Sequence, residues 1–187
     1  MPADPELKES RRNLPHWERA GGVYFVTFRL VSGKLAEPER QLVLDACLFW
    51  HKKKWRVEAV TVMPDHVHLL VQPLPTADGP TAAAIAPLGE IIGSVKKFSA
   101  RRIQQMRGTP GRLWQDERHD HLIRDEREFF QKLDYMAYNA VNRGLCRHWR
   151  EYPFFWSRYL VSEGGAPGRP DADSPDTALE SGATNDP

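Results

Sequence analysis

The sequence predicts an α+β fold in which one antiparallel β-sheet carries helices on one face. Short segments rich in β-branched and aromatic residues alternate with longer segments whose apolar residues recur every three or four positions. Along the chain these segments follow the order strand, helix, strand, strand, helix, strand, helix. This is the order of a ferredoxin-like α+β sandwich, and it would leave the second face of the sheet free for a ligand.

The first half of the chain supplies three of the expected strands. Residues 22–30 (GVYFVTFRL) have the composition of a strand, and Pro38 stands where a first helical turn would begin. Residues 39–53 then have the pattern of a helix, whose basic end would complement the helix dipole. Residues 55–63 and 65–73 are expected to be neighbouring strands, with a break at the proline between them.

The second half supplies the remaining elements. Residues 88–106 (LGEIIGSVKKFSARRIQQM) have the apolar stripe of an amphipathic helix, with basic side chains on its exposed side. A last strand is expected around residues 119–123. Asp125 is a favourable N-cap, so a third helix is expected over residues 125–142, and Gly144 would stop it.

The charge of the chain is unevenly distributed. The 187 residues, 41% of them hydrophobic, are enough for one domain with a core, and the net charge is only +1. Residues 162–187 contain six acids and one arginine, a net charge of −5, which leaves +6 for residues 1–161. We therefore expect a basic folded domain over residues 1–161 and an acidic disordered tail over residues 162–187. A basic domain suits a polyanionic partner.

Several classes of protein are disfavoured by what the sequence lacks. The two cysteines stand in no metal-binding or redox spacing, which favours a reduced, cytoplasmic setting. No apolar run approaches the length of a membrane span, so no membrane partner is expected. There is also no glycine-rich phosphate loop or dinucleotide motif, which argues against nucleoside triphosphate chemistry.

The central candidate site lies in residues 57–72 (VEAVTVMPDHVHLLVQ). His66 and His68 flank Val67, and in a strand their imidazoles would point to the same face with Cα atoms roughly 7 Å apart. Such a pair can bind one divalent metal ion. The alternative is a pair of half-buried strand histidines whose hydrogen bonds are satisfied.

The third expected helix holds a second candidate group. Tyr135 and Asn139 are four residues apart, so they stack on one side of the helix, on the polar face opposite its apolar stripe. A phenol can attack a phosphate that a metal ion polarises, and the amide oxygen of Asn139 could complete a metal site. Tyr135 could instead be an interfacial tyrosine with its hydroxyl in water. Tyr138 and Asn142 repeat the same spacing, so the helix alone does not choose between the two tyrosines.

Other histidines and basic residues are weaker candidates. His119 and His121 flank Asp120 and form a rival metal pair, but the acid would make the far side of that strand polar. Residues 1–21 are expected to form a polar, irregular arm whose basic and aromatic residues suit single-stranded nucleic acid. The alternative is an arm that Trp17 packs onto the domain. The candidate phosphate contacts in this arm and in the second helix are Arg11, Arg12, Lys96, Lys97, Arg101 and Arg102.

Taken together, these motifs resemble the REP-associated tyrosine transposases, which are insertion-sequence transposases with one catalytic tyrosine and a His-hydrophobe-His signature. The resemblance covers about residues 11–160, through the basic arm and the stretches GGVYFVTFRL, VTVMPDHVHLLVQP, WQDERHDHLIRDEREF and LDYMAYNAVNRGL. It implies a ferredoxin-like fold and the cleavage of single-stranded DNA near palindromic hairpins.

Matched by position, the resemblance assigns roles to residues. His66 and His68 would bind Mg²⁺ or Mn²⁺, with Asn139 as the third ligand. Tyr135 would be the nucleophile and would form a 5′-phosphotyrosine, leaving a free 3′-OH for strand transfer. Ala140 stands where the family usually has proline, which could alter the mobility of the helix.

The resemblance also implies partners and leaves alternatives. The expected partner is single-stranded DNA with hairpins, in the cytoplasm at the nucleoid. Tyr135 could serve the metal site of its own chain or that of a second copy in a homodimer. Two other functions stay open, a DNA-hairpin-binding protein that does not cleave and a metal-dependent nuclease that uses water.

Overall fold

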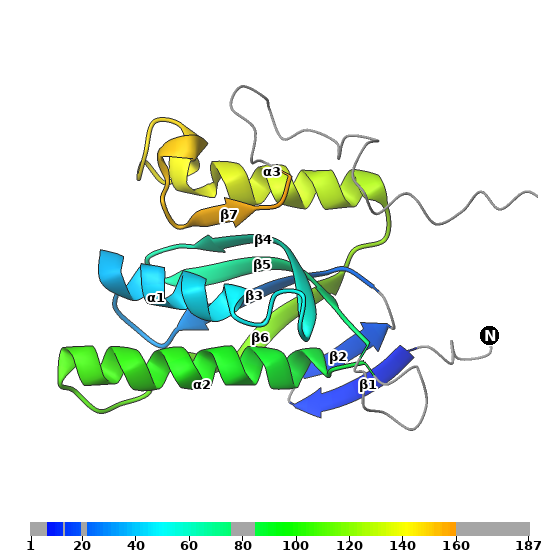
Figure 1. Cartoon of the computed structure of the whole chain (residues 1–187), viewed down its shortest axis with the longest axis horizontal. Helices are drawn as coiled ribbons and strands as arrows, with labels where there is room; N and C mark the ends of the chain where they lie inside the picture. Colours follow the sequence, from blue (N-terminus) through cyan, green and yellow to red (C-terminus); the bar gives the residue numbers. More distant parts are fainter. Residues whose placement is uncertain (1–6, 13, 20–21, 76–84, 160–187) are drawn as a thin grey trace, which may run out of the picture.

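The computed structural model describes residues 7–12, 14–19, 22–75 and 85–159. A five-stranded antiparallel sheet lies at its centre (Figure 1). From one edge to the other, its strands are β6 (Trp114–Leu122), β3 (Tyr24–Leu30), β5 (His66–Pro73), β4 (Trp55–Val62) and β7 (Phe155–Ser157). The order of the first four is that of a ferredoxin-like sheet, so the predicted fold class is confirmed.

Helices lie on both faces of this sheet (Figure 1). α1 (Glu37–Leu48) and α2 (Leu88–Arg107) cover one face, as expected from the sequence. α3 (Glu126–Asn142) packs against the other face. We had expected from the sequence that this face would be free, so that part of the prediction is wrong. The reason is the apolar stripe of α3, because Leu133 and Met136 are buried there against the strand residues Phe25, Ala59 and Leu70.

The side chains of β5 alternate between the two faces. Val67, Leu69 and Val71 enter the core beneath α1 and α2. Leu70 packs beneath α3, and the register of an antiparallel strand places His66 and His68 on that same face. Both faces of the central strand are therefore covered, which explains why seven of its eight residues are buried.

Some elements begin or end where the sequence did not indicate. α1 ends at Leu48 rather than at residue 53, because the basic residues 51–54 form the turn into β4. Lys52 in that turn has φ 61°, a left-handed conformation that a helix cannot contain. β6 begins at Trp114, before the expected start of the last strand.

The N-terminal arm is a hairpin rather than an irregular segment. β1 (Leu7–Arg12) pairs antiparallel with β2 (Leu14–Arg19). Arg11 and Arg12 belong to β1, but their side chains are outside the described part of the chain. The predicted tail over residues 162–187, and the boundary at residue 161, are also outside it. Among the helices that the structure describes, none is long and apolar enough to cross a bilayer.

The ends of the helices are fixed by specific hydrogen bonds. Asp125 caps α3 as predicted, since its carboxylate accepts a hydrogen bond of 2.8 Å from the backbone N–H of Glu128. In α1, the buried carboxylate of Glu39 accepts a bond of 2.7 Å from the backbone N–H of Ala36. The same carboxylate accepts bonds of 2.6 and 2.7 Å from Arg107 at the end of α2, so it joins the two helices. These bonds from Arg107 hold the pKa of Glu39 below its usual value of 4.5.

We expect Glu39→Gln to lower the free energy of unfolding at pH 7 by about 1–3 kcal/mol, because it breaks a buried charge-assisted pair. Glu37→Gln is the control, since Glu37 is exposed and lies 3.5 Å from Arg40. Urea denaturation measures both. The folded pKa of Glu39 is lowered, so its contribution is complete above about pH 4.5 and is lost as the pH falls through that folded pKa. The difference from wild type should therefore shrink on acidification, and equal stabilities at pH 7 would contradict the assignment.

Candidate active site

The two histidines of β5 face each other beneath α3. His66 and His68 are both buried, and their Nε2 atoms are 3.0 Å apart. The other ring nitrogen of each histidine is bonded elsewhere. Nδ1 of His66 is 2.7 Å from Oδ1 of Asp65, and Nδ1 of His68 is 2.8 Å from the hydroxyl of Thr27. Each ring is thus held by a hydrogen bond at Nδ1, its outer nitrogen, and the two Nε2 atoms point toward each other.

The bond to Asp65 decides which nitrogen of His66 carries hydrogen. A carboxylate only accepts hydrogen bonds, so Nδ1 of His66 donates to Asp65 and Nε2 is left with its lone pair. The hydroxyl of Thr27 can accept from Nδ1 of His68 in the same way. Metal-binding histidines are commonly oriented by such bonds. Two Nε2 lone pairs about 3 Å apart can occupy adjacent positions around one cation, given metal–nitrogen distances of about 2.0–2.1 Å.

Burial keeps both imidazoles neutral. It lowers the pKa of His66, against the opposing effect of the Asp65 carboxylate. Burial lowers the pKa of His68 to about 3, and the nearby His66, Arg29 and Arg143 add to this effect. Neutral imidazole is the form that binds metals, so the pair is ready for a cation at neutral pH without losing a proton.

Tyr135 reaches this pair from α3. Its hydroxyl is 3.5 Å from Nε2 of His68, and its ring packs edge-on against the rings of His68 and Phe25. The side chain is 48% exposed, so the hydroxyl lies between the buried histidines and solvent. Tyr138 is also exposed, but it makes no hydrogen bond or ring contact with another described residue. The structure therefore separates two tyrosines that the helical pattern could not.

Asn139 lies on the histidine side of α3 and is buried, which corrects the expectation that it belongs to an exposed polar face. Side chains four or eight residues apart on α3 contact successive positions at and just before β5. Tyr135 meets His68, and Nη1 of Arg143 is 3.1 Å from Oδ1 of Asp65. Asn139 lies between Tyr135 and Arg143 along α3, one helical turn from each.

The amide oxygen of Asn139 is unsatisfied. Oδ1 is buried and has no hydrogen-bond partner among the described residues. A buried acceptor without a partner costs about 1–3 kcal/mol, so a native protein retains one where it has another use. Two imidazole nitrogens and one amide oxygen form a neutral donor set of a kind that can bind a divalent cation. Within the described part of the chain, no group of three His, Cys, Asp or Glu residues could form a metal site.

A polar cavity of about 470 Å³ opens beside Tyr135 and His68. Arg29 and Lys132 line it, with Nζ of Lys132 4.9 Å from the centre of the Phe25 ring. Sequence reasoning missed Thr27, Arg29 and Lys132. The first two could have been found from strand pairing, since Thr27 stands opposite His68 and Arg29 opposite His66 in the register of β3 with β5.

The two histidines of the rival pair in β6 have different surroundings. His119 is exposed and lines the same cavity, next to Thr27 in the register of β3 with β6. His121 is held by Glu128, whose Oε1 is 2.6 Å from Nε2 of the imidazole. Asp120 pairs with Arg118 at 2.9 Å, where both side chains are largely buried. Its role is therefore structural.

The predicted phosphate contacts of α2 lie away from the histidines. Lys97, Arg101 and Arg102 are exposed on α2, which covers the opposite face of the sheet. Lys96 donates to the backbone carbonyls of Gln115 and Asp116 at 2.5 and 3.0 Å, so it ties α2 to β6. The cations that surround the candidate site are instead Arg29, Lys132 and Arg143.

Comparisons with known proteins point to one family. A curated protein of Haemophilus influenzae, provisionally named a REP-associated tyrosine transposase, is 34% identical over 101 residues. The match covers 51% of this chain and 55% of that protein, so the chain spans about half the length of its curated relative. This similarity confirms the resemblance seen in the sequence motifs. No family model matches the chain.

Solved structures share the fold. A REP-associated tyrosine transposase bound to a REP hairpin aligns with 79% of this chain and 81% of its own, with a TM-score of 0.60 and 22% identity. A protein of Deinococcus radiodurans R1, provisionally named a transposase, aligns with 60% of this chain and 86% of its own, with a TM-score of 0.43 and 20% identity. The first likeness supports the α+β fold described above.

We expect Asp65→Asn to weaken the binding of Mn²⁺ by about 10- to 100-fold, because a neutral amide accepts more weakly from Nδ1 of His66 and can also donate to it, so the tautomer that presents Nε2 is no longer enforced. Asp134→Asn is the matched control, since Asp134 lies on the exposed side of α3. Electron paramagnetic resonance of Mn²⁺ measures the free ion during titration. Equal affinities of the Asp65→Asn variant and wild type would show that the histidines do not bind the cation.

Proposed function

We propose that this chain is a REP-associated tyrosine transposase that cuts and rejoins single-stranded DNA at palindromic hairpins through Tyr135. The observation that carries this proposal is the approach of the Tyr135 hydroxyl to 3.5 Å from Nε2 of His68, within a pair of converging imidazoles. The motifs shared with the transposase family and the similarity to the curated relative support the same assignment.

His66, His68 and Asn139 would hold the divalent cation, Mg²⁺ or Mn²⁺, which polarises the scissile phosphate and neutralises charge on the leaving oxygen. The orphaned Oδ1 of Asn139 supports its place as the third ligand. All three donors are neutral, so none of them offsets the positive charge of the cation. The full charge would then be available to attract the scissile phosphate. Arg29 and Lys132 would attract the flanking phosphates from the walls of the cavity.

Cleavage is a transesterification at phosphorus. The hydroxyl of Tyr135 gives up its proton to water at the open side of the site, and its oxygen forms a bond to phosphorus. The bond from phosphorus to the 3′ oxygen breaks, and that oxygen takes up a proton and leaves as a 3′-OH. The 5′ phosphate stays on Tyr135 as a phosphodiester. A 3′-OH from another strand reverses these steps, so strand transfer needs no external energy source.

One chain supplies every group that this reaction needs. Tyr135 and His68 come from the same chain and are already in contact, and Asn139 lies one helical turn beyond Tyr135. The proposed activity therefore does not require a second copy to donate its tyrosine. Fixing the nucleophile on a helix packed against the metal-ligand strand also restricts the geometry of attack.

Tyr135→Phe should abolish the covalent protein–DNA adduct while hairpin binding persists, because the change removes only the attacking oxygen. The measurement is denaturing electrophoresis after incubation of labelled hairpin DNA with protein and Mn²⁺. Tyr138→Phe, which removes the hydroxyl of another exposed tyrosine of the same helix, should leave the adduct unchanged. Adduct formation by Tyr135→Phe would move the nucleophile to another residue. Cleavage without an adduct in both proteins would instead indicate a nuclease that uses water.

Chelation of divalent ions should stop cleavage and leave the DNA bound. EDTA is expected to reduce adduct formation by Tyr135 to background, since an uncompensated phosphate is a poor target for a phenol. Binding of the hairpin, followed by fluorescence anisotropy, should change little, and added Mn²⁺ should restore the adduct. An undiminished adduct in EDTA would exclude the role assigned to His66 and His68.

A further inference from the structure

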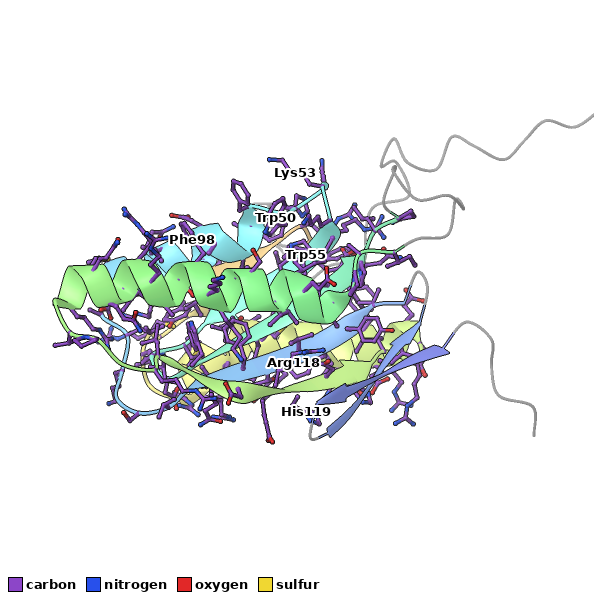
Figure 2. All side chains as sticks on the ribbon, turned by 90° about the horizontal axis from the view of Figure 1, so that it is seen from below. Trp50, Lys53, Trp55, Phe98, Arg118 and His119 are labelled. Carbon is purple, nitrogen blue, oxygen red and sulfur yellow. The ribbon has the colours of Figure 1, made fainter. Side chains whose placement is uncertain are left out.

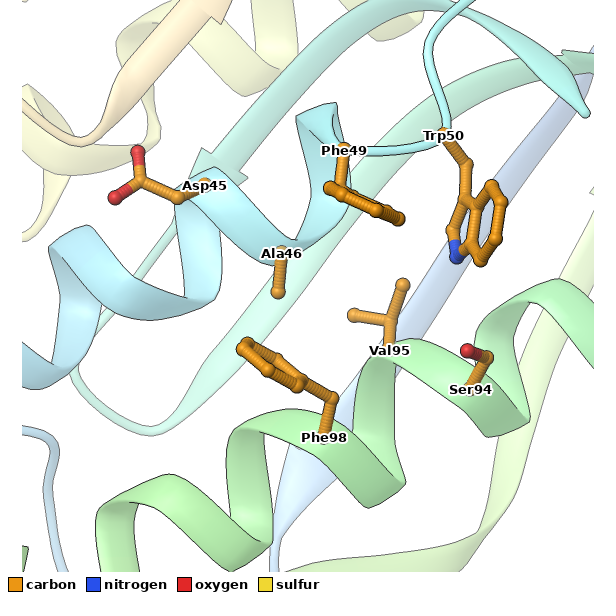
Figure 3. Close-up of a pocket in the computed structure, with 7 residues that line it drawn as sticks. All are labelled: Asp45, Ala46, Phe49, Trp50, Ser94, Val95 and Phe98. Carbon is orange, nitrogen blue, oxygen red and sulfur yellow. The ribbon is translucent and has the colours of Figure 1, made fainter. Parts of the chain in front are cut away.

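A second concave surface lies on the face of the sheet opposite the histidines. α1 and α2 leave a groove of about 320 Å³ between them, whose walls include Phe49, Trp50, Val95 and Phe98 (Figure 3). Ala46 of α1 and Val95 of α2 lie toward its floor, so the lining is largely apolar. Nothing in the proposed cleavage reaction uses this groove.

Two large aromatic rings in the groove are exposed. Phe49 is 59% exposed and Phe98 is 53% exposed, from opposite walls (Figure 3). Leaving apolar area in water forgoes about 25 cal/mol per Å² of burial. Single exposed apolar residues are common, but neighbouring aromatic rings around a cavity mark a binding surface.

Cations surround these rings. Lys52, Lys53 and Lys54 are exposed at one end of the groove, with Nζ of Lys53 4.8 Å from the centre of the Phe49 ring and Nζ of Lys54 4.3 Å from that of Trp50. Figure 2 shows Lys53, Trp50 and Phe98 on the same side of the molecule. On α2, the exposed cations next to Phe98 are Lys97, Arg101 and Arg102.

The groove contains one acid, Asp45, whose carboxylate accepts a hydrogen bond of 2.9 Å from Gln41. The six exposed cations named above give the α1–β4 turn and the exposed side of α2 a surplus of positive charge. The ligand that fits must therefore combine negative charge with flat apolar faces. Unpaired nucleotides have both, since their bases stack on aromatic side chains while their phosphates meet lysine and arginine.

We propose that this groove binds the unpaired loop of the DNA hairpin, with bases stacked on Phe49 and Phe98. This inference rests on the proposed function for the identity of the DNA. In this proposal Lys97, Arg101 and Arg102 contact phosphates of the loop, whereas the cleavage site gives them no contact with DNA. The lysines of the α1–β4 turn contact the phosphates that flank the stacked bases.

The separation of the two surfaces suits a hairpin. Trp55, which follows the lysine turn, is six residues along β4 from Thr61, the partner of His68 in register. At about 3.3 Å per residue this is about 20 Å, or about six base pairs of duplex at 3.4 Å each. The groove and Tyr135 lie on opposite faces, so the DNA must also pass around an edge of the sheet. A stem longer than this can therefore present its loop to the groove while its single-stranded foot reaches Tyr135.

The test compares two hairpins that differ only in the loop, one with bases and one with abasic sites that keep every phosphate. Fluorescence anisotropy with the full chain, carrying Tyr135→Phe so that nothing is cleaved, gives both affinities. Phe49→Ala and Phe98→Ala should each weaken binding of the loop with bases about tenfold and leave the abasic loop unchanged. Phe49→Trp should restore the affinity, because it restores a stacking surface. Met106→Ala, which removes an exposed apolar side chain of α2 outside the groove, should have no effect.

Equal affinities of the phenylalanine variants and their parent for the loop with bases would overturn the proposal. An equal loss on both hairpins would also overturn it, because the rings would then support the protein rather than bind bases. With Tyr135 intact, Phe49→Ala should form the covalent adduct on a short single strand without a hairpin at the wild-type rate. If no adduct forms but the phenylalanine variants bind the loop with bases more weakly, the cleavage function is rejected and the loop-binding groove is retained. The two proposals can therefore be contradicted independently.

Discussion

The alternation of side chains along β5 is the constraint on which the rest of the structure depends. The register with β3 on one side and β4 on the other places Val67, Leu69 and Val71 beneath α1 and α2. His66 and His68 then have to face the other way. A slip of one residue would exchange the two sets and bury the imidazoles in the apolar core. The histidine face is therefore fixed by the packing of the opposite face.

The position of the tyrosine follows from the same packing. Leu133 and Met136 of α3 need an apolar surface, and the histidine face offers one at Phe25, Ala59 and Leu70. When this apolar stripe packs there, the hydroxyl of Tyr135 lies near Nε2 of His68, and Arg143 donates a hydrogen bond to Asp65. The hydroxyl of Thr61 donates to the backbone carbonyl of Met136 at 3.1 Å, and this bond sets the height of the helix over the sheet. The packing of α3 against the sheet thus also sets the position of Tyr135 relative to His68.

Much of this could be predicted from the sequence, and the failures have physical causes. The face shared by His66 and His68 follows from strand periodicity, and the cap at Asp125 follows from residue chemistry. The helical pattern shows that α3 has an apolar stripe, but it does not say which face of the sheet receives that stripe. The burial of Asn139 was missed for this reason. The helical pattern also left Tyr135 and Tyr138 as equal candidates, and only the family resemblance favoured Tyr135. The early end of α1 depends on the left-handed conformation of Lys52, which no residue pattern indicated.

The central claim is that Tyr135 becomes covalently joined to DNA. Mass spectrometry of the digested protein–DNA adduct, after the DNA is trimmed by a nuclease, measures which peptide carries the remaining nucleotide. The account predicts the added mass on Tyr135 and an unmodified Tyr138. Nucleotide mass on Tyr138, or on no tyrosine of α3, would contradict it.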